Sequence, residues 1–323
     1  MRMRLSIAGL VMLIAGTGMS AQVKTPPETR NAALRYWMAF AEMQDPPSDK
    51  ATQELLEKTA GGEVSWDEVK LGPILDANAD AIAAFQRATK LPECDWGIEY
   101  SRGPRALVAY APRARVLARL NTLQGMREMA KGQSQAALDT WLAGIRFTDH
   151  LTKGGSLIFV LIAKGTLLPI LRELTTDARQ GRLNSMQKKQ LYAAVHALPE
   201  DGFDWGRAWE TEETAGEILF GELQRSQNPA ALYESLMGAT SPKDCVPPST
   251  QQVQAYSNYM RNVAAALRLP PAKTPGRLAE LDGEAKDICG AVRQVIPAPQ
   301  RVNDARIEMI AARGDLLQAL QTK

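Results

Sequence analysis

The stretch that decides the fold class is PRARVLARLNTLQGMREMAKGQSQAALDTWLAGIRFTDH, residues 112–150. Apolar residues in its first half are spaced four, three, three and four apart, so they share one face of an α-helix: Val116, Leu120, Leu123, Met126 and Ala130. Gly132 ends this pattern, and a second helical pattern follows through Trp141 and Ile145. The sequence therefore predicts two amphipathic helices joined by a short turn.

This predicted hairpin resembles one unit of a tetratricopeptide repeat. The resemblance rests on a turn glycine, small residues where paired helices touch and an aromatic between them: Gly125, Gly132, Ala137, Leu138, Trp141, Gly144 and Ile145. Asn121 and Gln124 replace the aromatic and the leucine expected in the first helix, and no second copy recurs at the repeat period. The resemblance therefore implies one helical hairpin over about residues 112–150, not a repeat array.

A longer stretch, residues 94–155, resembles an uncharacterised exported all-helical bacterial family. The shared features are a CDWG-like segment, a helix rich in arginine and leucine, the hairpin, and a Gly-Gly pair before the next helix. Because that family has no assigned activity, the resemblance implies a bacterial, exported protein and no chemistry.

Helical patterns continue on both sides of the hairpin, and strand patterns are almost absent. Residues 31–43 are apolar on most sides and are expected to be buried. Asp204 is expected to cap a long helix, and Ser249 or Thr250 to cap another. The predicted fold is all-α, with paired antiparallel helices in a tetratricopeptide-like or short α-superhelical array.

The N-terminus has the three-part layout of a secretory signal peptide. Arg2 and Arg4 precede an apolar stretch over residues 5–18, which is shorter than the roughly 20 residues of a membrane span. We expect a signal peptide at residues 1–21, removed near Ala21, and a periplasmic or secreted protein. Residues 22–323 are expected to form a single all-helical domain, with a softer joint near residues 240–248.

The charge of the chain is nearly balanced, with 38 Lys and Arg against 36 Asp and Glu. Removal of the leader takes away two arginines and no acids, which leaves 36 against 36. A nucleic acid or an anionic membrane would require a basic surface. The expected partner is therefore an unknown protein or a small-molecule ligand, with no nucleic acid.

The most apolar run, residues 157–171, is interrupted by Lys164 and Pro169 and is interpreted as a buried helix, with no membrane span after leader removal. An unpaired ammonium in such surroundings would cost several kcal/mol. The sequence therefore predicts that Lys164 is buried beside a carboxylate, with Glu212 as the first candidate.

The common catalytic signatures are missing from the sequence, which contains no HExxH, GxSxG, P-loop or GxGxxG motif. The two histidines, His150 and His196, fall at the ends of different predicted helices, where interaction with the helix dipole is favoured over catalysis. We predict no metal site, no cofactor and no catalytic residue.

The tripeptide Asp-Trp-Gly occurs twice, at residues 95–97 and 204–206. One hypothesis is a binding pocket for a sugar or a cation, lined by acids and aromatic rings: Asp95, Trp96, Tyr100, Trp205, Trp209 and Glu212. The favoured alternative is structural, with each aspartate capping a helix and each tryptophan filling the core behind it.

Three cysteines occur in a chain expected to reach an oxidising compartment. Cys245 and Cys289 belong to the same C-terminal segment, whereas Cys94 lies in the distant CDWG loop. A disulfide between Cys245 and Cys289 is therefore predicted, against no bridge or another pairing.

These patterns favour an exported helical protein that binds or scaffolds an unknown ligand. The alternative is a carboxylate-dependent hydrolase. The two hypotheses differ in one respect: catalysis requires Glu212, Glu213, Asp95 and one histidine to converge in one cleft.

Overall fold

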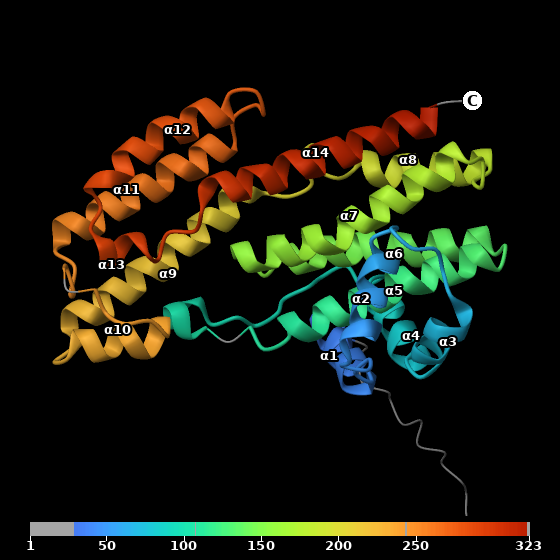
Figure 1. The fold of residues 1–323 in the computed structure, drawn as a ribbon, viewed down its shortest axis with the longest axis horizontal. Helices are drawn as coiled ribbons and strands as arrows, with labels where there is room; N and C mark the ends of the chain where they lie inside the picture. The colour runs from blue at the N-terminus through green and yellow to red at the C-terminus, as the bar shows by residue number, and fades with distance from the viewer. Residues whose placement is uncertain (1–28, 107, 243, 322–323) are drawn as a thin grey trace, which may run out of the picture.

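The computed structural model describes residues 29–106, 108–242 and 244–321, and this part is all-α (Figure 1). The described residues contain no strand, and a single isolated bridge joins Asn31 to Glu93. The predicted fold class is confirmed. The predicted signal peptide, residues 1–21, lies outside the described residues.

Two groups of helices make up the molecule. The first contains α1 (Ala32–Glu42), α2 (Lys50–Ala60), α3 (Glu68–Asp76), α4 (Ala79–Ala88), α5 (Ala111–Ala130), α6 (Ser134–Thr152), α7 (Leu157–Arg179) and α8 (Ser185–His196). The 3-10 helix η1 (Tyr100–Arg105) precedes α5 in the chain but packs on α9 of the second group. The second contains α9 (Trp205–Arg225), α10 (Pro229–Met237), α11 (Thr250–Leu267), α12 (Thr274–Glu284), η2 (Ala285–Asp287) and α13 (Gly290–Arg293). The remaining helix, α14 (Pro299–Gln321), runs from the second group back along α7 and α8 (Figure 1).

The predicted hairpin is present as α5 and α6, which pack along each other. At their contact the indole of Trp141 lies against Gly125, where any Cβ atom would overlap the ring. The Trp141 Nε1 donates a hydrogen bond to the carbonyl oxygen of Thr122 at 3.2 Å. The small residue at position 125 is therefore required by close helix packing. The arrangement of the remaining helices as a tetratricopeptide-like array stays a prediction.

Helix α7 is the central element, because it packs against α5, α6, α9 and α14. On the α6 side, Gly144 makes room for the side chain of Ile170. Among the described helices, including α7, none combines the length and the apolar character that crossing a bilayer requires.

Two predicted helix starts have the expected caps. The Asp204 side chain accepts a hydrogen bond from the backbone N–H of Arg207 at the start of α9, and Ser249 accepts one from Gln252 at the start of α11. Helix α10, a short helix with Pro229 in its first turn, was not predicted.

The prediction that residues 31–43 are buried holds for one face of α1 only. Tyr36 and Phe40 are in the core, but Leu34, Trp37 and Met38 are exposed. Helix α1 packs mainly on α4, with weaker packing on α5, so its opposite side is left uncovered.

A buried arginine holds α14 against the second group of helices. Arg306 is 4% exposed and pairs with Asp201 at 2.8 Å. It also donates to the Leu269 carbonyl oxygen at 2.9 Å and to the Thr274 Oγ1 at 3.1 Å. Since these partners come from the α8–α9 connection, the α11–α12 connection and the first residue of α12, one side chain of α14 holds several segments together.

Candidate functional site

The three tryptophans of the hypothesised aromatic pocket lie in the hydrophobic core. Trp96, Trp205 and Trp209 are 8%, 1% and 0% exposed. The Trp96 ring stacks on Tyr110 with centroids 4.0 Å apart, and its Nε1 donates to the His150 carbonyl oxygen at 2.8 Å. Their surfaces are occupied by protein, which agrees with the structural interpretation of the Asp-Trp-Gly segments.

The two aspartates of these segments have different roles. Asp204 caps α9, as described above. Asp95 lies in the connection before η1, where its carboxylate accepts from the Gly97 N–H at 2.9 Å and its backbone exchanges two hydrogen bonds with the Asn31 side chain. The prediction that each aspartate caps a helix is therefore wrong for Asp95, because no helix begins there.

Of the hypothesised binding residues, Tyr100 and Glu212 are brought close together. Burial raises the pKa of Tyr100 to about 12, and the neighbouring Glu212 carboxylate acts in the same direction. Glu212 accepts a hydrogen bond from the backbone N–H of Leu157 at 2.8 Å. The first turn of α7 is thus capped by a side chain of α9, while its own N-cap, Ser156, makes no side-chain cap bond. Burial raises the pKa of Glu212, and the bond from Leu157 opposes this rise.

The groups that a carboxylate-dependent hydrolase would need are held by separate partners. Glu213 pairs with Arg261 at 2.8 Å, and the His150 Nδ1 is 2.8 Å from the hydroxyl of Tyr36. Burial lowers the pKa of His150, so this side chain is neutral at pH 7 and the expected interaction of a charged histidine with the helix dipole does not apply. Within the described residues there is no group of three or more His, Cys, Asp or Glu side chains that could hold a metal ion.

The most strongly perturbed carboxyl group is that of Asp177 on α7. Its side chain is fully buried, and burial raises its pKa to about 7 although Arg182 lies 2.9 Å away. Glu173, one turn earlier, also has a pKa raised by burial. A pKa near neutrality suits acid–base chemistry, but a substrate cannot reach a carboxyl group with no exposed surface.

Lys164 has the predicted kind of partner but not the predicted residue. Its Nζ lies 2.5 Å from a carboxylate oxygen of Glu308 on α14, and Arg172 pairs with the other oxygen at 2.7 Å. The lysine is half-buried, and Glu212 is engaged elsewhere. The prediction of Glu212 was wrong because the face of α7 that carries Lys164 is covered by α14.

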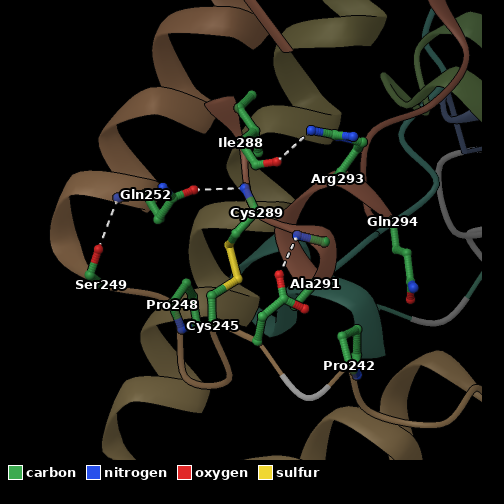
Figure 2. The surroundings of a disulfide bond; sticks show 12 residues. Pro242, Cys245, Pro248, Ser249, Gln252, Ile288, Cys289, Ala291, Arg293 and Gln294 are labelled. Atoms are coloured by element: carbon green, nitrogen blue, oxygen red, sulfur yellow. Dashed lines mark hydrogen bonds between the residues drawn. A yellow bond between two sulfur atoms is a disulfide. The ribbon is translucent and has the colours of Figure 1, made fainter. Parts of the chain in front are cut away.

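Cys245 and Cys289 form a disulfide, as predicted (Figure 2). It joins the α10–α11 connection to the residue before α13. The Cys289 N–H donates to the side chain of Gln252 at 2.8 Å, as Figure 2 shows. The neighbouring Gly290 N–H donates to the Asp244 carboxylate at 3.1 Å. Cys94 is a free, half-buried thiol, and burial raises its pKa to about 12.

The strongest candidate for a ligand site is a groove that sequence reasoning missed. It has a volume of about 530 Å³ and lies between α2, α5 and α7. It is lined by Glu57, Ala60, Gly61, Arg115, Arg119, Thr122, Ile158, Leu161, Ile162, Gly165, Thr166 and Pro169. We call it the α2/α5/α7 groove.

One side of the α2/α5/α7 groove is apolar. Ile158 and Leu161 on α7 are 48% and 41% exposed, unusually high for such side chains on a helix that is otherwise central to the core. Gly165 and Pro169 continue the same face one and two turns further. The interpretation of residues 157–171 as a buried helix is therefore wrong for this face. Leucine and isoleucine occur on every side of the helix, so the sequence pattern does not show which face remains exposed.

The other side of the groove is charged. Arg119 pairs with Glu57 at 3.1 Å, and burial lowers the pKa of Arg119. Arg115, one turn before, is exposed and has no ion pair among the described residues. With one acid and two arginines, the lining carries a formal charge of +1.

A second cavity, of about 350 Å³, lies between the end of α6 and the start of α9. Its charged lining residues are Asp149, Lys153, Asp204 and Arg207, so its formal charge is balanced. Asp149 and Lys153 already face each other at 3.5 Å, and Asp204 is the cap of α9. Two of its charged residues are thus paired with each other and a third is engaged at a helix start, and its volume is smaller than that of the α2/α5/α7 groove, which is the better candidate.

Comparison of the chain with protein-family models, with curated proteins and with solved structures finds no match.

Proposed function

We propose that the protein is an exported helical binding protein and that its ligand lies in the α2/α5/α7 groove. The observation that carries this proposal is the exposure of Ile158 and Leu161 inside a groove of about 530 Å³. Ligand sites in proteins are concave, mostly apolar and about 300–1,000 Å³ in volume. Covering the exposed part of each side chain would contribute about 1 kcal/mol to binding.

The dimensions of the groove favour a small molecule over a protein partner. Twelve residues line it, whereas a stable protein–protein interface uses about 20–30 residues on each side. Small residues at Ala60, Gly61 and Gly165 let a narrow ligand approach the backbone of α2 and α7. The scaffolding form of the hypothesis is therefore less well supported than ligand binding.

The carboxylate-dependent hydrolase has no observation in its favour. Asp95, Glu212 and Glu213 each stabilise a different part of the fold. Export is supported by the leader-like sequence at residues 1–21. Intact-mass measurement of protein recovered from the periplasm or the medium is expected to show cleavage near Ala21, and a mass that includes Met1 would contradict export by a cleaved leader.

Ligand binding is tested by titrating the purified protein with Nile red, an uncharged apolar dye whose fluorescence increases in apolar surroundings. We expect saturable binding, which Leu161→Gln weakens about fivefold because it removes exposed apolar surface from the groove. Met186→Gln is the matched control, because Met186 is 80% exposed and lies outside the groove. Equal binding by both variants and the parent protein would refute the proposed site.

A further inference from the structure

The α2/α5/α7 groove carries an uncompensated positive charge beside its apolar side, and the inference drawn from this rests on the proposed function. Arg119 is neutralised by Glu57, whose carboxylate lies 3.1 Å from its guanidinium. Arg115 is one helical turn away on the same helix and lines the same groove. Its guanidinium has no ion pair among the described residues.

The α7 side of the groove is suited to a narrow hydrocarbon chain. Ile158, Leu161 and Ile162 follow one another at helical spacing along one face. Gly165 and Thr166, whose side chains are small, line the next turn of the same face. No charged residue of α7 belongs to the lining. Lys164 is directed instead to Glu308 on α14.

We infer that the ligand is a single-chain anionic amphiphile, with its chain on α7 and its head group beside Arg115. A planar guanidinium binds a carboxylate through two parallel hydrogen bonds. Arg115 is available for this contact, whereas Arg119 would first have to leave Glu57. The apolar side of the groove supplies affinity, and the unpaired Arg115 selects a head group with a negative charge.

The inference is tested by calorimetric titration with decanoate and decyltrimethylammonium, each below its critical micelle concentration, and with decanol below its solubility limit. Decanoate should bind about 5–10 times more tightly than decanol, and the cation most weakly, because an exposed charge pair adds a modest amount to apolar burial. The preference for decanoate should shrink as salt is added.

Two variants locate the charge effect. Arg115→Gln should reduce decanoate binding to the level of decanol and leave decanol binding unchanged. Arg179→Gln removes an exposed arginine of α7 that does not line the groove and should preserve the preference. Because Arg115 is exposed, its replacement is expected to leave the melting temperature unchanged.

The outcomes separate the inference from the proposed function. Equal binding of decanoate and decanol, both sensitive to Leu161→Gln, would retain the groove as a ligand site and overturn the anionic amphiphile. Failure of all three compounds to bind would overturn both the anionic amphiphile and the groove as a small-molecule site, and would favour a protein segment as the partner.

Discussion

At the scale of single residues, burial has more influence than neighbouring charge on how several acids of this protein titrate. Arg182 lies 2.9 Å from the Asp177 carboxylate, yet the pKa of Asp177 is raised to about 7 because the side chain has no exposed surface. Glu212 is similar, with a pKa raised by burial despite a hydrogen bond from Leu157. Desolvation of a charged carboxylate is costly unless it is fully compensated.

The raised pKa of Asp177 predicts a specific pH dependence of stability. In the unfolded chain an aspartate has a pKa of about 3.9, so folding favours the protonated form of Asp177. The contribution of this group is fully favourable below about pH 4 and is lost as the pH rises through about 7. Asp177→Asn should therefore stabilise the protein by roughly 2–4 kcal/mol at pH 8 and by less at pH 4.5.

Urea unfolding at the two pH values measures this difference. Asp315→Asn, at an exposed position of α14, is the control and should show no comparable change between the two pH values. A loss of stability in Asp177→Asn at pH 8 would mean that the ion pair with Arg182 outweighs desolvation.

At the scale of elements, α7 depends on its neighbours at both its start and its middle. Its first turn is capped by Glu212 of α9, and its Lys164 is neutralised by Glu308 of α14. A helix begins stably only when its free N–H groups find acceptors. The position of α7 therefore depends on the correct docking of the second group of helices.

Replacement of Glu212 tests this cap. Glu212→Gln keeps an oxygen acceptor for the Leu157 N–H and avoids a buried charge, so we expect stability equal to or above that of the parent at pH 7. Glu212→Leu removes the acceptor and should cost about 1–2 kcal/mol. Thermal unfolding of the two variants side by side is the measurement, and an equal loss in both would show that charge, not hydrogen bonding, is what position 212 supplies.

The elements that follow from short-range patterns were predictable from the sequence, and those that depend on tertiary packing were not. The α5–α6 hairpin and the caps at Asp204 and Ser249 depend on residues a few positions apart. The partner of Lys164 is 144 residues away, and no local pattern indicates it. The groove was missed for the same reason, because the exposed face of α7 depends on how far α2 and α5 extend over that helix.

At the scale of the whole molecule, the disulfide fixes the second group of helices. It joins residues 44 positions apart and lies between the α10–α11 connection and α13. Closing a loop of this size restricts the unfolded chain, which corresponds to about 3–4 kcal/mol of stability. The double variant Cys245→Ser, Cys289→Ser should lose an amount of this order, while Cys94→Ser should lose much less.

Peptide mapping without reduction measures the linkage directly. A peptide pair containing Cys245 and Cys289, with alkylated Cys94 as the remaining thiol, is expected. Alkylation of Cys245 and Cys289 in the untreated protein would contradict the linkage.

The packing of α14 on α7 also determines the order in which the molecule can be completed. Synthesis proceeds from the N-terminus, so the segments near the start of the chain are the first that are available for folding. Helix α7 is made long before α14, so the side of α7 that carries Lys164 faces water until residues 299–321 emerge. The nascent chain therefore passes through a stage in which its central helix is present but only partly covered. A chaperone that recognises apolar helices would have its longest opportunity to bind α7 during that interval.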